Sequence, residues 1–68
     1  MRYKAPLEEY KFIKLVKSFN YDVISSSKHN KIIDENGNCL MVFAISHSKR
    51  GKREVKPVYI NLFLNKIQ

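Results

Sequence analysis

The sequence is poor in the residues that build most compact catalytic or metal sites. It has one cysteine, two glycines, two prolines, no tryptophan and only six acidic residues. It contains no Ser-His-Asp order, no phosphate-binding P-loop and no Gly-rich dinucleotide turn. A single cysteine and two histidines that stand eighteen positions apart match no zinc-ligand spacing. We therefore expect neither a metal site nor any other cofactor.

Long apolar segments are also missing. No apolar run approaches the ~20 residues that a membrane-spanning helix needs, and the first residues lack the apolar region of a signal peptide. The one cysteine, Cys39, cannot form an internal disulfide, and its place in an apolar run predicts a small core residue. Together these features lead us to expect a reduced, cytoplasmic protein that does not contact membranes.

Positive charge is what the sequence has in excess. Thirteen Lys and Arg residues against six Asp and Glu give a net charge of +7 on 68 residues. A chain of this length forms one domain, 1–68, which we expect to be a monomer when free. The charge favours a polyanionic partner such as nucleic acid, although a basic surface can also serve solubility alone.

The hydrophobic pattern predicts an α+β fold. Apolar residues follow helical spacing in the first and last thirds of the chain, and apolar runs separated by turn residues lie between them. We expect a three-stranded antiparallel sheet in meander order, with both helices packed on one face. The expected elements are a helix of about thirteen residues opened by Pro6 and ended by Asn20, strands in 21–27, 28–34 and 39–45, a polar loop at 46–54, and a helix from Pro57 to Ile67.

Four details refine this prediction. Glu8 and Glu9 are expected in the first turn of the first helix, near the positive end of its dipole. The Asn36-Gly37 pair is typical of a tight hairpin in which φ is positive. The run 39–45 is apolar on both faces, which predicts a central strand covered by helices. Val58 and Leu62 are expected on the outer side of the last helix.

Histidine is the only side chain here that exchanges protons near neutral pH without assistance. His29 stands between Lys28 and Lys31 at the expected start of the second strand. An imidazole flanked by ammonium groups is suited to phosphate chemistry, which needs a proton acceptor and charge neutralisation. A single strand histidine is more often an ordinary surface residue, and His47 has a weaker claim than His29.

The polar loop carries the densest positive charge of the chain. Because a helix N-terminus with free N–H groups follows this loop, we interpret the loop as a phosphate clamp rather than only a solvated segment. The residues predicted to bind RNA are Lys28, Lys31, His47, Lys49, Arg50, Lys52, Arg53 and Lys56.

Three stretches resemble the HicA family of bacterial toxins, which are small mRNA-cleaving proteins with a fold like the double-stranded RNA-binding domain. Ser27-Lys28-His29-Asn30-Lys31-Ile32 is similar to the family's Gly-Ser-His-His-Lys-Phe pattern. Ala44-Ile45-Ser46-His47 is similar to its apolar-Pro-any-His pattern. Gly51-Lys52-Arg53-Glu54-Val55-Lys56-Pro57 is similar, with one inserted residue, to its Gly-Lys-Glu-Leu-Lys-Pro helix start.

The resemblance implies a toxin of a toxin–antitoxin pair that cleaves mRNA without a metal, with His29 as the catalytic residue and a cognate antitoxin as partner. Ser27 stands where the family has Gly, and Asn30 stands where it has a second histidine. Two alternatives therefore stay open. One is an RNA-binding module without catalysis on the same fold, and the other is a phage-encoded module that binds a protein.

Overall fold

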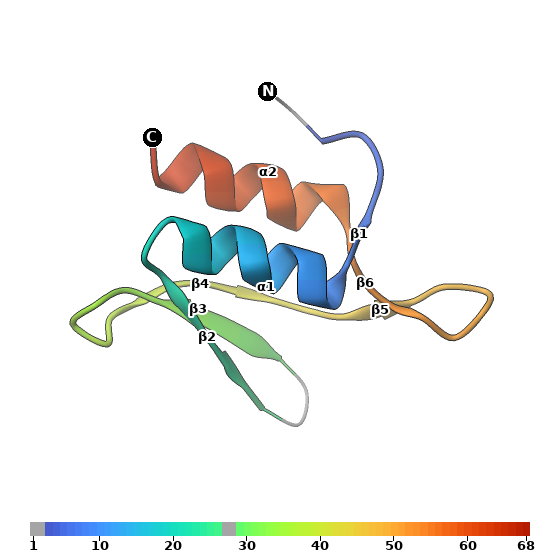
Figure 1. Ribbon diagram of the computed structural model, residues 1–68, viewed down its shortest axis with the longest axis horizontal. Helices are drawn as coiled ribbons and strands as arrows, with labels where there is room; N and C mark the ends of the chain where they lie inside the picture. Colours follow the sequence, from blue (N-terminus) through green and yellow to red (C-terminus); the bar gives the residue numbers. More distant parts are fainter. Residues whose placement is uncertain (1–2, 27–28) are drawn as a thin grey trace.

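The computed structural model describes residues 3–26 and 29–68. Both helices lie on the same side of the strands (Figure 1). The predicted α+β class is confirmed, but the strands form two three-stranded antiparallel sheets instead of one, in the orders β2-β3-β4 and β1-β6-β5. The elements are β1 (Leu7–Glu8), α1 (Glu9–Ser18), β2 (Asp22–Ser25), β3 (Asn30–Ile33), β4 (Cys39–Phe43), β5 (Ser46–His47), β6 (Arg53–Val55) and α2 (Pro57–Lys66).

Helix α1 buries the apolar face that its spacing predicts and ends where the sequence indicates. Phe12 and Val16 are fully buried. Asn20 has a φ of 68°, and its N–H donates to the Lys17 carbonyl at 3.0 Å, while the Tyr21 N–H donates to the Val16 carbonyl at 3.3 Å. This is the Schellman arrangement, in which a left-handed residue satisfies the last carbonyls of a helix.

The predicted start of this helix is wrong. Pro6 does not open α1, which begins at Glu9 with Glu8 as its N-cap residue. Residues 7 and 8 are instead extended, because Leu7 pairs with Val55 and Glu8 with Glu54 in the β1-β6-β5 sheet. Pairing with a strand more than forty positions along the chain therefore overrides the local preference of proline for a first helical turn.

The larger sheet is a meander, as predicted, but its central strand is β3 and not the apolar run 39–45. Strand β4 is an edge strand, so Met41 and Phe43 are buried toward the helices while Val42 is 43% exposed. Cys39 is exposed, which corrects its prediction as a core residue. The reason is that both helices lie on one face of this sheet and leave the other face uncovered (Figure 1).

The turn between β3 and β4 is confirmed, with a different backbone from the one expected. The Gly37 N–H donates to the Asp34 carbonyl at 3.1 Å, and Asp34 Oδ1 accepts the N–H groups of Asn36 and Asn38 at 2.9 Å each. Gly37 has a φ of 83°, whereas Asn36 does not have a positive φ. One glycine after an ordinary turn is enough to reverse the chain.

The predicted polar loop 46–54 is a second hairpin, formed by β5 and β6. The Gly51 N–H donates to the Ser48 carbonyl at 2.9 Å, and the Ser48 N–H donates to the Lys52 carbonyl at 2.9 Å. Gly51 has a φ of 77°. Ser48 and Gly51 thus repeat the positions of Asp34 and Gly37, and this spacing is the sequence signal by which the hairpin could have been predicted.

One hydrophobic core joins the helices to the sheets. Phe12 contacts Phe43 edge-to-face with ring centroids 5.0 Å apart, and Phe63 of α2 lies 6.0 Å from Phe12 and 5.7 Å from Tyr21. Helix α2 begins at Pro57 as predicted. The buried apolar residues are Phe12, Val16, Ile32, Met41, Phe43, Val55, Ile60 and Phe63.

Within the described ranges, 3–26 and 29–68, no helix combines the length and apolar character required to cross a membrane.

Candidate nucleic-acid interface

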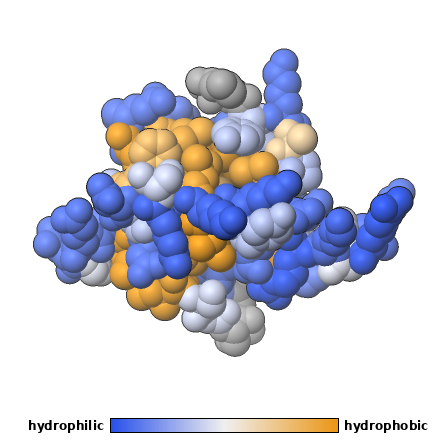
Figure 2. Space-filling model, viewed as in Figure 1, coloured by the Kyte–Doolittle hydropathy of each residue, from blue (hydrophilic) through white to orange (hydrophobic). Residues whose placement is uncertain are grey.

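The β5–β6 hairpin presents two cations at its turn. Lys49 and Arg50 are both exposed there. The Ser48 hydroxyl accepts the N–H groups of Arg50 at 3.3 Å and Lys52 at 3.2 Å, which fixes the turn backbone. The hairpin extends from the body of the protein on the right in Figure 1, and the same region of the surface is strongly hydrophilic in Figure 2. Positive charge is therefore displayed on an ordered arm.

The cations at the base of this hairpin have acidic partners. Arg53 donates to both carboxylate oxygens of Glu9, from Nε at 2.7 Å and from Nη2 at 3.1 Å. Lys52 Nζ lies 3.6 Å from Glu8 Oε1. Lys52 and Arg53, both predicted to bind phosphate, therefore attach the hairpin to the start of α1.

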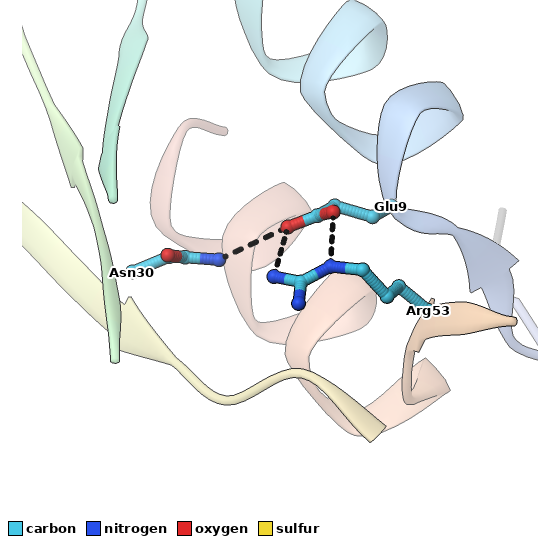
Figure 3. A network of polar contacts seen from close by, with 3 residues as sticks. All are labelled: Glu9, Asn30 and Arg53. Atoms are coloured by element: carbon cyan, nitrogen blue, oxygen red, sulfur yellow. Dashed lines mark hydrogen bonds and ion pairs between the residues drawn. The ribbon is translucent and has the colours of Figure 1, made fainter. Parts of the chain in front are cut away.

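A third residue completes the contact around Glu9 (Figure 3). Asn30 is only 3% exposed, and its side-chain amide donates to Glu9 Oε2 at 3.5 Å. Asn30 begins β3, directly after the turn of the β2–β3 hairpin, whereas Arg53 begins β6. The Glu9 carboxylate consequently connects the β2–β3 hairpin to the β5–β6 hairpin.

Sequence reasoning missed this network. Glu9 does lie in the first turn of α1, as predicted, but its partners stand 21 and 44 positions away along the chain. In the sequence, Asn30 is notable only as the residue that directly follows His29. No local pattern in the sequence indicates either contact, because both depend on how the sheets pack.

The network predicts how stability depends on pH. The hydrogen bond from Arg53 holds the pKa of the Glu9 carboxyl below its ordinary value of 4.5. Because this pKa is lower in the folded state, the stabilisation is complete above about pH 4.5 and is lost as the pH falls through the lowered folded value. We expect the urea midpoint of Glu9→Gln to lie below that of wild type at pH 7 and to converge with it toward pH 3.

The matched control is Glu35→Gln, which makes the same chemical change at an exposed turn residue. Its urea midpoint is expected to follow that of the wild type from pH 7 to pH 3. The backbone N–H of Asn38 also lowers the pKa of the Asp34 carboxyl. Wild type and both variants are therefore all expected to lose some stability in acid. A constant difference between Glu9→Gln and wild type across this range would show that Glu9 does not contribute through its charge.

The remaining cations predicted on this arm lie near the network. His47 is exposed on β5 and pairs with Arg53 across the strands. Lys56 is exposed and is the N-cap residue of α2, with extended backbone and no side-chain cap. The structure therefore brings His47, Lys49, Arg50, Lys52, Arg53 and Lys56 together on one hairpin and the helix start that follows it.

His29 and Lys31 lie on a different hairpin. His29 is exposed next to the turn between β2 and β3, where the Ser26 N–H donates to its carbonyl at 3.0 Å and its own N–H donates to Ser26 Oγ at 3.2 Å. Lys31 is exposed on β3 between the buried Asn30 and Ile32, so strand alternation turns its side chain away from the helices. Lys28 lies outside the described residues.

The two hairpins point in different directions, the β2–β3 hairpin downward and the β5–β6 hairpin to the right in Figure 1. Among the described residues, Lys31 is the only predicted cation on the same hairpin as His29. A nucleic acid that used every predicted residue would have to extend over both hairpins.

Across residues 3–26 and 29–68, no group of three or more His, Cys, Asp or Glu side chains is arranged to hold a metal ion. Comparison with known proteins found no matching family model, no matching curated protein and no matching solved structure.

Proposed function

We propose that this protein binds RNA through the turn of the β5–β6 hairpin. The observation that carries the proposal is the exposure of Lys49 and Arg50 on a hydrogen-bonded hairpin turn of a chain with a net charge of +7. In the described part of the chain, neither side chain has a carboxylate within 4.0 Å. Cations without acidic partners are the groups that exchange counterions for phosphates most easily.

The base of the hairpin has a different role. Because Arg53 and Lys52 are engaged by Glu9 and Glu8, a phosphate would have to compete with these carboxylates. Paired charges therefore hold the arm in place, and the turn contacts the ligand. The nearby start of α2 supplies a further set of N–H groups next to Lys56.

We expect the double substitution Lys49→Ala/Arg50→Ala to weaken RNA binding by about 25-fold at 0.1 M salt, because two phosphate contacts on a single strand contribute about 1.4 to the slope of log K against log salt. The slope itself should decrease by the same 1.4. Fluorescence anisotropy with a labelled RNA at several salt concentrations measures both quantities.

The control removes the same charge elsewhere. Lys17→Ala/Lys66→Ala lowers the net charge by the same amount at the ends of α1 and α2 that lie opposite the β5–β6 hairpin (Figure 1). It should keep most of the affinity. If both double variants bind equally weakly, the interaction depends on net charge and not on the hairpin.

We further propose that the protein cleaves mRNA in the cytoplasm as a HicA-like toxin, on a fold in which α1, the β2–β3–β4 meander and α2 adopt a double-stranded RNA-binding-domain-like arrangement. The supporting observation is the exposure of His29 next to the β2–β3 turn, two positions before the exposed Lys31 of β3. An antitoxin would neutralise the toxin by covering the basic hairpin.

The chemistry assigned to His29 needs no metal. The neutral imidazole accepts the proton of a ribose 2′-OH, whose oxygen then attacks the adjacent phosphorus. The bond from phosphorus to the 5′-oxygen breaks, which leaves a 2′,3′-cyclic phosphate, and the leaving oxygen takes a proton from solvent. The Lys31 ammonium stabilises the negative charge that develops on the phosphate. The need for a 2′-OH selects RNA over DNA.

A protein-binding function is the other candidate. Val58 is 63% exposed and Leu62 is 41% exposed on the outer face of α2, as the sequence predicts. Two such residues are ordinary on a protein surface. Association with a protein that is insensitive to salt, together with no binding to RNA, would favour this function over the proposed one.

A further inference from the structure

A hollow of about 430 Å³ lies between the start of α1 and the turn of the β5–β6 hairpin. Tyr10 is 54% exposed there, although a tyrosine in so small a protein would add substantial area to the core if buried. The volume falls within the range of ligand-binding clefts. The residues that line the hollow are Glu8, Glu9, Tyr10, Gly51, Lys52 and Arg53.

The charges of the hollow are arranged in two zones. Each carboxylate of the lining is paired with a lining cation, Glu9 with Arg53 at 2.7 Å and Glu8 with Lys52 at 3.6 Å, so the lining is close to neutral. Cations without acidic partners among the described residues lie next to two of the lining residues, Tyr10 and Gly51. Lys11 and Lys14 place their ammonium groups 6.0 and 5.8 Å from the centre of the Tyr10 ring, and Lys49 and Arg50 belong to the turn that contains Gly51.

A neutral hollow with an aromatic wall and a cationic border fits a nucleotide better than a simple anion. The base is flat and uncharged and can stack on the tyrosine ring, while its phosphates lie outside among the lysines. The lysine ammonium groups near Tyr10 are solvated, and an exposed cation–π contact is weaker than a base–aromatic stack, so a base can displace them.

We propose that Tyr10 stacks on an unpaired nucleobase and that the hollow is a single-stranded RNA site. This inference rests on the proposed RNA binding and adds the class of RNA that is bound. Bases in an A-form duplex remain stacked on one another and are unavailable to a side chain, whereas those of single strands and loops can turn outward.

The test compares a short single-stranded RNA with the same strand in a duplex, by fluorescence anisotropy. Tyr10→Ala should weaken binding to the single strand by about 5- to 150-fold, the range for loss of one base stack, and leave the salt slope unchanged. Tyr10→Phe should bind as the wild type does, since the ring is retained. The preference of the wild type for single strands should disappear in Tyr10→Ala.

The outcomes separate this site from the proposed function. If Tyr10→Ala binds the single strand as wild type does while Lys49→Ala/Arg50→Ala binds weakly, the base site is wrong and RNA binding stands. If the wild type binds neither RNA, both proposals fail. If an acidic peptide competes with RNA on equal terms and Tyr10→Ala loses both ligands, the hollow binds peptides and the nucleobase assignment is overturned.

Discussion

His29→Ala is expected to reduce the rate of RNA cleavage by about 10²- to 10⁴-fold, the contribution of a positioned general base. The loss should occur in the chemical step, because the alanine variant keeps the cations of the β5–β6 hairpin and therefore its affinity for RNA. Cleavage of a labelled single-stranded RNA at saturating protein, with EDTA present, measures that step alone.

Two variants make the result specific. His29→Gln should lose as much activity as His29→Ala, because an amide forms hydrogen bonds but does not accept a proton at neutral pH. Lys66→Ala, at an exposed position in the last turn of α2, should cleave at the wild-type rate. Equal rates for wild type and His29→Ala would remove this residue from the mechanism and leave an RNA-binding module.

Phe63→Ala is expected to cost about 3–5 kcal/mol of folding free energy, as is usual when a buried phenyl ring is deleted. Phe63 is fully buried and meets the rings of Phe12, Phe19 and Tyr21 within 6.1 Å. At roughly 0.05–0.15 kcal/mol per residue, a chain of this length has a total stability of only about 3–10 kcal/mol. Much of the variant should therefore be unfolded in buffer, as urea titration followed by far-UV circular dichroism would show.

Phe19→Ala provides the comparison at the edge of the same cluster. Phe19 is 44% exposed, and its ring centroid lies 6.1 Å from that of Phe63. Its loss should cost about 1 kcal/mol, since the typical point substitution has an effect of that size. Equal costs for the two variants would mean that the core is not organised around Phe63.

The hydrogen bond from Asn30 to Glu9 relates the Glu9 network to the proposed function. Asn30 directly follows His29, and Arg53 is the residue with which His47 pairs. The carboxylate that binds both thus joins the hairpin assigned to catalysis to the hairpin assigned to RNA binding (Figure 3). The Asn30 side chain, 3% exposed and bonded to Glu9, is part of the internal support of both hairpins.

Features governed by neighbouring residues were predictable from the sequence. The apolar spacing of Phe12 and Val16, the left-handed Asn20, the turn after Asp34 and the start of α2 at Pro57 all depend on groups a few positions apart. Such preferences act through the backbone and side chains of one segment, so they can be read without knowledge of its neighbours. The positive charge of residues 46–54 was also evident from the sequence, whereas the hairpin that these residues form was not predicted.

Only the tertiary structure decided which segments meet. It divided the strands between two sheets, made Leu7–Glu8 a strand instead of a helix start, and engaged Arg53 with Glu9 while Lys49 and Arg50 stayed exposed. It also left Tyr10 at the wall of a hollow. Contacts between residues tens of positions apart depend on how the whole core is buried. A local pattern of residues therefore does not predict them.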